Sequence, residues 1–142
     1  MSSTMLSAQA RNFNWLLSSF QTGTEGVDHA FAVSSDGLLI ALSTSLTRDE
    51  ADKMAAVVTG LQSLSEGARV LLNHSRLKRV ILDLEDGYLL ISTISDAATL
   101  GVAASYDCDL GYVGYEMTLF AEKVGDQLTP EILTELRHAV QE

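Results

Sequence analysis

The sequence contains a single cysteine, Cys108, a single proline and few aromatic residues, which make up 6% of the chain. One cysteine excludes a disulfide within the chain and fits a reducing compartment. The apolar runs at residues 37–42 and 88–91 are far shorter than the roughly 20 residues of a membrane-spanning helix. No basic segment leads into an apolar stretch at the N-terminus, so no secretory signal is expected. We therefore expect a cytoplasmic protein that does not insert directly into a membrane.

Basic residues are also scarce. Nine Lys and Arg stand against nineteen Asp and Glu, which gives a formal net charge of -10 at pH 7. This charge repels phosphate backbones and anionic lipid, so we expect no nucleic-acid partner. The acidic excess fits either a solvated surface or a complement to a basic partner. The 142 residues are enough for one core without a disulfide or a metal.

Motifs for catalysis and cofactor binding are missing as well. The chain has no G-x-x-x-x-G-K-[ST] phosphate loop and no G-x-S-x-G nucleophile elbow. His29, His74 and His138 are far apart in the sequence, and none has another ligand at a metal-binding spacing. We expect no enzyme activity, no cofactor and no metal.

The segment "DCDLGY" resembles a calcium loop only faintly. A calcium loop needs glycine at its sixth position and glutamate at its twelfth, but Tyr112 and Thr118 occupy these places. We interpret Asp107 and Asp109 as residues that favour the start of a helix. Negative charge on both sides of Cys108 disfavours a reactive thiolate.

Two hairpins can be predicted from turn dipeptides between apolar runs. Asp36-Gly37 separates "VDHAFAVS" from "LLIALS", and Asp86-Gly87 separates a strand at 78–84 from one at 88–95. Both dipeptides tolerate the positive φ angles of two-residue hairpin turns. A fifth strand is expected at 100–106. The strands are apolar at nearly every position, so we expect helices on both faces of the sheet.

Helices are predicted at both ends of the chain and between the hairpins. Leu6, Ala10, Phe13, Leu17 and Phe20 have the spacing of one helical face over 6–20. A second helix follows residue 111, and a third begins at Pro130 with Thr129 as its N-cap. The predicted order is α-β-β-α-β-β-β-α with a C-terminal helical extension. This is an α/β/α sandwich on a five-stranded antiparallel sheet, divided into a domain at 1–128 and an extension at 129–142 packed on it.

The long helix between the hairpins carries the most informative pattern. Thr47 and Glu50 have the spacing of a capping box, and the helix should run to about Gly67, with a continuation through "ARVLLNH" as the alternative. At 100° per residue, one arc is expected to face the sheet: Met54, Val57, Val58, Leu61, Leu64 and Ala68. The opposite arc holds small residues: Ala56, Thr59, Gly60, Ser63 and Gly67. Charge is depleted on this small-residue arc, which indicates a protein interface there. The alternative is an ordinary solvated face.

Three features together resemble the roadblock/dynein light chain family, especially its bacterial members. They are "AVSSDGLLIAL", the small-residue helix "ADKMAAVVTGLQSLSEGA" and "DLGYVGYEM", in this order over about residues 7–126. The resemblance implies a profilin-like sandwich and a homodimer, in which the third strands pair edge to edge and the long helices lie side by side. It also implies a non-enzymatic signalling protein that regulates a small Ras-like GTPase. In some bacterial systems a sensor-kinase-like membrane protein is a further partner.

The resemblance assigns the interface to the long helix and the third strand. The candidate residues are Asp52, Ala56, Thr59, Gly60, Ser63, Gly67, Lys78, Val80, Leu82 and Leu84. A different class of function stays open at this point, namely a small-molecule sensory or adaptor module without GTPase regulation. Such a module needs a polar cluster between helix and sheet, and the sequence alone indicates none.

Overall fold

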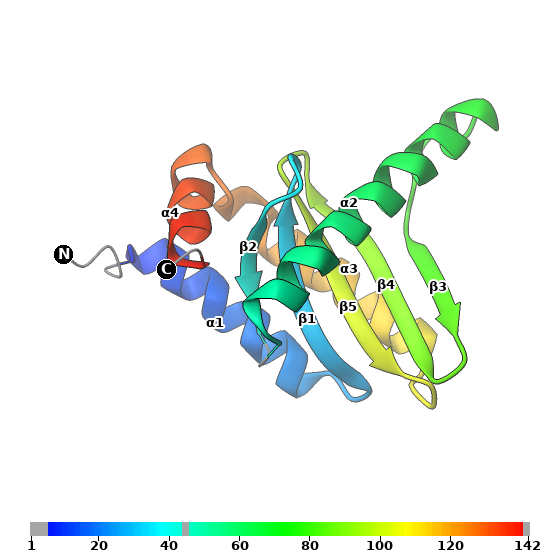
Figure 1. Ribbon diagram of the computed structural model, residues 1–142, viewed down its shortest axis with the longest axis horizontal. Helices are drawn as coiled ribbons and strands as arrows, with labels where there is room; N and C mark the ends of the chain where they lie inside the picture. Colours follow the sequence, from blue (N-terminus) through cyan, green and yellow to red (C-terminus); the bar gives the residue numbers. More distant parts are fainter. Residues whose placement is uncertain (1–5, 44–45, 141–142) are drawn as a thin grey trace.

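The computed structural model describes residues 6–43 and 46–140. In these ranges one five-stranded sheet lies between two helical layers (Figure 1). The elements follow one another as α1 (Ala8–Gly23), β1 (Val27–Ser34), β2 (Leu39–Leu42), α2 (Arg48–Leu71), β3 (Val80–Leu84), β4 (Gly87–Ser95), β5 (Ala98–Ser105), α3 (Leu110–Val124), the 3-10 turn η1 (Gly125–Gln127) and α4 (Pro130–Val140). The predicted α+β class, element order and antiparallel sheet are confirmed.

The strand order in the sheet is β2-β1-β5-β4-β3, and all pairings are antiparallel. Strand β5 therefore lies at the centre, and β2 and β3 are the two edge strands. Strand β3 is shorter than predicted, because pairing with β4 begins at Val80 and not at Lys78.

Both hairpins form, but neither has the predicted turn. The β1–β2 loop spans residues 35–38, with Gly37 at a φ of 89°. In the second hairpin Leu84 pairs with Gly87, so the loop is Glu85 and Asp86, and Gly87 does not have a positive φ. Glycine is needed there for another reason: a Cβ on Gly87 would lie 2.7 Å from the carbonyl oxygen of Ala104. Close strand approach, rather than turn geometry, requires this glycine.

The two faces of the sheet form two separate cores. On β4, Leu90 packs on the side of α1, α3 and α4, whereas Leu89 and Ile91 pack on the side of α2. On β1, Ala30 and Phe31 divide in the same way. Successive strand residues are apolar because each points into a different core.

The α1 and α3 helices are joined by aromatic side chains. The Phe120 ring centroid lies 6.0 Å from that of Phe13 and 5.4 Å from that of Phe20, with tilted planes. These distances are within the favourable range for aromatic pairs. The predicted core face of the first helix is confirmed for Phe13 and Phe20, which are buried.

The start of α2 is held by the predicted capping box. The Glu50 backbone N–H donates to Thr47 Oγ1 at 3.2 Å, and the Thr47 N–H donates to Glu50 Oε1 at 3.0 Å. The Thr47 backbone N–H is the main cause that lowers the pKa of the Glu50 carboxyl, and the Thr47 hydroxyl, which donates to Glu50 Oε1 at 3.0 Å, lowers it further. The helix continues without a break for 24 residues to Leu71, four residues beyond the predicted end at Gly67.

The C-terminal helix α4 lies against the edge strand β2 (Figure 1). It begins as predicted, with Ile132 N donating to Thr129 Oγ1 at 3.3 Å. At its other end, Arg48 Nη1 of α2 donates to the Val140 carbonyl oxygen at 3.0 Å. The helix thus covers β2 and contacts the start of α2, which leaves β3 as the other edge of the sheet.

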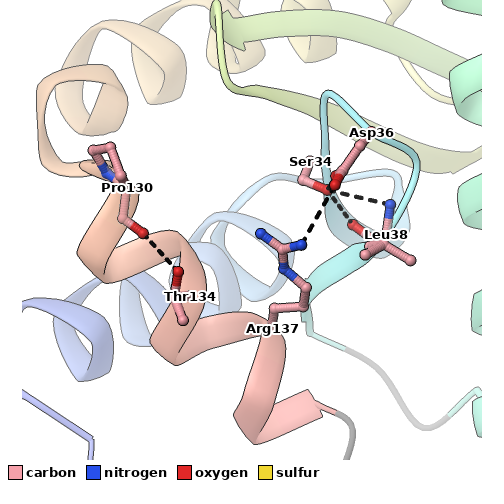
Figure 2. A network of polar contacts seen from close by, with 6 residues as sticks. All are labelled: Ser34, Asp36, Leu38, Pro130, Thr134 and Arg137. Atoms are coloured by element: carbon pink, nitrogen blue, oxygen red, sulfur yellow. Dashed lines mark hydrogen bonds and ion pairs between the residues drawn. The ribbon is translucent and has the colours of Figure 1, made fainter.

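A polar network attaches α4 to the β1–β2 loop (Figure 2). Ser34 Oγ donates a hydrogen bond to Asp36 Oδ1, and Leu38 N donates to Ser34 Oγ at 3.2 Å. Arg137 Nη1 of α4 lies 3.4 Å from Asp36 Oδ2. The Ser34 hydroxyl is the main cause that lowers the pKa of the Asp36 carboxyl, and Arg137 lowers it further.

We expect Asp36→Asn to lower the free energy of unfolding at pH 7 by at most about 1 kcal/mol, because Asp36 is exposed. A carboxyl with a lowered pKa in the folded state stabilises the fold above its unfolded pKa of about 4, and this contribution is lost as the pH falls through the folded pKa. Urea denaturation at pH 7 and pH 3 should therefore show a difference that narrows at pH 3. Arg137→Gln, which keeps the Ser34 hydroxyl, should cost less than Asp36→Asn. A difference that stays constant between the two pH values would contradict this role of the Asp36 charge.

Candidate interaction surface

Helix α2 buries mainly small residues against the sheet. Ala51, Ala55 and Val58 are buried, and Met54 and Leu61 pack at the edge of the same core. Alanine at the centre of the contact lets the helix axis approach the strands closely. The core under α2 is therefore filled mostly by side chains of the sheet.

Part of the predicted sheet-facing arc is wrong. Val57, Leu64 and Ala68 are exposed on the outer side of α2. The helix has two apolar faces, one toward the sheet and one toward solvent. The prediction assigned the large apolar residues of both faces to a single arc, whose centre therefore falls between the two faces. The outward-facing apolar residues are thus left without a place in the core of this chain.

The outer face of α2 carries a regular seam. It consists of Val57, Gly60, Leu64, Gly67 and Leu71, at alternating spacings of three and four residues. Val57 is 46% exposed, Leu64 76% and Leu71 87%. An apolar repeat of 3.5 residues is typical of a helix that packs along another helix. We refer to these five residues as the α2 seam.

The two glycines of the α2 seam, Gly60 and Gly67, have open space beside them, which we call the hollows of the seam. A Cβ built on Gly60 or on Gly67 would meet no atom within 4 Å. Neither glycine is therefore required by the packing of this chain. Since each lowers helix propensity by about 1 kcal/mol relative to alanine, a compensating contact outside the chain is expected.

Three other predicted residues lie beside the seam. Ala56 and Ser63 are exposed, and at 100° per residue they fall within about 40° of Asp52 around the helix. Asp52 forms an exposed ion pair with Arg48 at 3.2 Å. We call Asp52, Ala56 and Ser63 the α2 flank.

Thr59 does not belong to the exposed face, contrary to prediction. Its hydroxyl donates to the Ala55 carbonyl oxygen at 2.9 Å, and its side chain is directed toward Gly37 in the β1–β2 loop. It is half-buried because its position on α2 falls on the sheet side of the flank. It lines a polar hollow of about 340 Å³ together with Ser34, Gln62 and Thr93.

The candidate residues of the third strand separate into two groups. Val80 and Leu82 are half-buried and pack against the α2 core, whereas Lys78 is exposed just before β3 and Leu84 is 51% exposed at its end. The side of β3 away from β4 has no neighbouring strand among the described residues. Unpaired backbone groups on an apolar edge strand favour pairing with another chain.

Sequence reasoning missed Leu71 and Ile81. Leu71 belongs to the seam, and Ile81 is 49% exposed on β3. The signal for Leu71 was present, because the three-and-four spacing from Val57 passes through both glycines and ends at Leu71. Ile81 carries no such signal, since its exposure depends on which strand lies at the sheet edge.

The residues that the sequence analysis considered as calcium or metal ligands, or as a reactive thiol, do not form a site of that kind among the described residues. Asp109 is the N-cap of α3, where its Oδ1 accepts from Tyr112 N at 3.1 Å, as the prediction of a helix-start role requires. Burial raises the pKa of the Cys108 thiol, and the Asp107 and Asp109 carboxylates raise it further. Within 6–43 and 46–140, no group of three His, Cys, Asp or Glu residues could hold a metal ion, and no helix is long and apolar enough to cross a membrane.

The fold and surface define a class of protein: a profilin-like α+β domain with an exposed apolar seam on its long helix and one open sheet edge. The chain belongs to the Roadblock/LC7 domain family, whose sequence model matches residues 13–104. The predicted family is therefore confirmed. No curated protein matches the sequence.

Solved structures agree with this assignment. A Roadblock/LC7 domain from Streptomyces avermitilis is 30% identical to the chain, covers 81% of it and 96% of its own length, and superposes with a TM-score of 0.76. The gliding protein MglB from Thermus thermophilus has 17% identity, covers 87% of this chain and 93% of its own, and also has a TM-score of 0.76. Profilin IA of Acanthamoeba castellanii has 12% identity, 81% and 98% coverage and a TM-score of 0.53. At these low identities, MglB and profilin are similar to the chain in fold alone.

Proposed function

We propose that the protein is a non-enzymatic regulator or scaffold that forms a homodimer and binds a small Ras-like GTPase. The observation that carries the proposal is the α2 seam, which exposes apolar side chains and open glycine hollows in one continuous line. The seam and the free edge of β3 lie on the two elements that the family resemblance assigns to self-association. The GTPase partner is inferred from that resemblance.

In the proposed dimer the two α2 helices pair antiparallel along their seams. Leu64 is the middle residue of the seam, and in an antiparallel pair it lies near the symmetry axis. The glycines on either side of it then receive apolar side chains of the partner helix, as knobs enter holes. Such an interface should bury about 800 Å² on each subunit, the size of a stable protein contact.

The α2 flank is an exposed strip of the helix beside the seam. Because Asp52, Ala56 and Ser63 lie to one side of the seam, two paired helices present two flanks to solvent. We propose that the GTPase binds this paired surface. Regulation would then consist of ordering the GTPase's own catalytic groups or of localising it.

We expect Ala56→Arg to leave the dimer intact and to weaken GTPase binding by roughly tenfold or more, since a long charged side chain would occupy the flank. The measurement is calorimetric titration with a candidate Ras-like GTPase, loaded with GDP or with a non-hydrolysable GTP analogue, beside light-scattering mass. Lys123→Ala on α3, away from α2, is the control and should bind normally. If no candidate GTPase binds the wild-type protein in either nucleotide state, the proposed partner class is wrong.

A second candidate function rests on the polar hollow beside Thr59. Its lining hydroxyls and the Gln62 amide provide the polar cluster that a small-molecule sensory module needs. Gln62 Nε2 donates to Thr93 Oγ1 at 2.8 Å, while Gln62 Oε1 is buried with no partner among the described residues. A metabolite that raises the melting temperature of the wild type but not of Gln62→Leu would favour this function.

A further inference from the structure

The exposed edge of β3 has an ordered distribution of charge. The segment 76–86 reads RLKRVILDLED, with cations at its start, an apolar centre and anions at its end. Arg76 and Lys78 are exposed before the strand, and Glu85 and Asp86 are exposed after it. No Asp or Glu occurs between Glu66 and Asp83, although the whole chain has a net charge of -10. Charge is thus separated along this one edge.

The two sides of β3 fix which residues can meet across the edge. Val80 and Leu82 pack on the α2 side, whereas Arg79 reaches α3, donating from Nη2 to the Gly114 carbonyl oxygen at 2.8 Å. Even-numbered residues therefore face α2 and odd-numbered residues face α3. If β3 of a second copy pairs with this edge, the α2 faces of the two sheets continue each other only when even-numbered residues lie opposite even-numbered residues.

Antiparallel self-pairing satisfies this condition when it is centred on Ile81 or on Leu82. Centred on Leu82, it places Lys78 across from Asp86 and Arg79 across from Glu85 of the other copy. Centred one residue earlier, on Ile81, the pairing places Arg76 across from Asp86 and Arg79 across from Asp83, so cations again face anions. Parallel pairing would instead place like charges together, which is unfavourable.

We propose that the segment 76–86 is a self-recognition element that selects a second copy of this chain, in antiparallel orientation, over other roadblock proteins. The proposal rests on the proposed homodimer and adds the partner's identity and the orientation of pairing. The apolar centre supplies contact area, and the charged ends decide which chain can pair. A related chain without this order of charges would meet unpaired or like charges at both ends.

The test uses two charge-reversed full-length chains. One carries Arg76→Glu and Lys78→Glu, so both ends of its edge are acidic; the other carries Glu85→Lys and Asp86→Lys, so both ends are basic. Arg79 is left unchanged because it is bonded to α3. Each variant alone should self-associate at least about tenfold more weakly than wild type, and an equimolar mixture should form a heterodimer. Sedimentation velocity measures the strength of self-association, and native mass spectrometry measures the fraction of heterodimer in the mixture.

A control variant separates local pairing from overall charge. Arg11→Glu with Lys123→Glu changes the net charge as much as the acidic-end variant but lies on α1 and α3, and it should dimerise like wild type. Melting curves should show all three variants folded. If the wild type dimerises and the mixture shows no preference for the heterodimer over either self-pair, the self-recognition proposal is wrong while the homodimer stands. If the wild type is a monomer at tens of micromolar, the proposed dimer itself is wrong.

Discussion

Gly60→Glu should leave the protein folded and abolish its self-association. The added side chain meets open space, since a Cβ on Gly60 has no neighbour within 4 Å. Replacing a glycine inside a helix should even stabilise the monomer by several tenths of a kcal/mol. In the proposed dimer, however, the glutamate fills a hollow of the seam and its charge must be desolvated against another helix. That cost is several kcal/mol if the charge is unpaired, which corresponds to a loss of affinity of about 100-fold or more.

The measurement pairs a melting curve with a light-scattering mass at several protein concentrations. Gly23→Glu is a matched control, because Gly23 is also an exposed helical glycine with open space around it, but at the end of α1. The control should melt and dimerise like wild type. A Gly60→Glu protein that remains dimeric would mean that the seam is only solvated surface.

Gly101→Ala should lower the free energy of unfolding. Overpacking a core usually costs about 1–3 kcal/mol, and we expect a value near the upper end of this range. Gly101 on the central strand β5 lies directly across from Phe31 on β1. The Phe31 ring folds over the glycine and occupies the space that a Cβ would need. Phe31 is itself buried between the sheet and α2, so the ring cannot move away without disturbing that core.

Urea denaturation of single and double variants tests this contact. Phe31→Leu alone should destabilise the protein, but in the Gly101→Ala background it should cost less, because the smaller side chain makes room for the new methyl group. Gly23→Ala, in open space, should cause no loss of stability. Strictly additive effects of Gly101→Ala and Phe31→Leu would show that the ring does not restrict this position.

Local signals in the sequence were sufficient for the secondary structure and the family. The Thr47 and Glu50 capping box and the Thr129 and Pro130 helix start each depend on residues a few positions apart, and both were found where predicted. Both hairpins also formed, although their turns differ from the predicted ones. Apolar residues at successive strand positions correctly indicated a sheet covered on both faces. These features are encoded in short stretches of the chain, so they can be inferred without knowing how the stretches pack.

Tertiary structure alone decided which face of each element is free. The sequence shows that α2 has apolar residues on several sides, but only packing on the sheet shows that Ala51 and Ala55 face inward and Leu64 and Leu71 face outward. Likewise, β3 became an open edge through the strand order, and β2 was covered by α4. Exposure is a property of contacts between distant segments. A residue's own type and spacing therefore do not determine it. The sequence indicated α2 and β3 as the interface elements, but only the folded chain showed which of their residues are exposed.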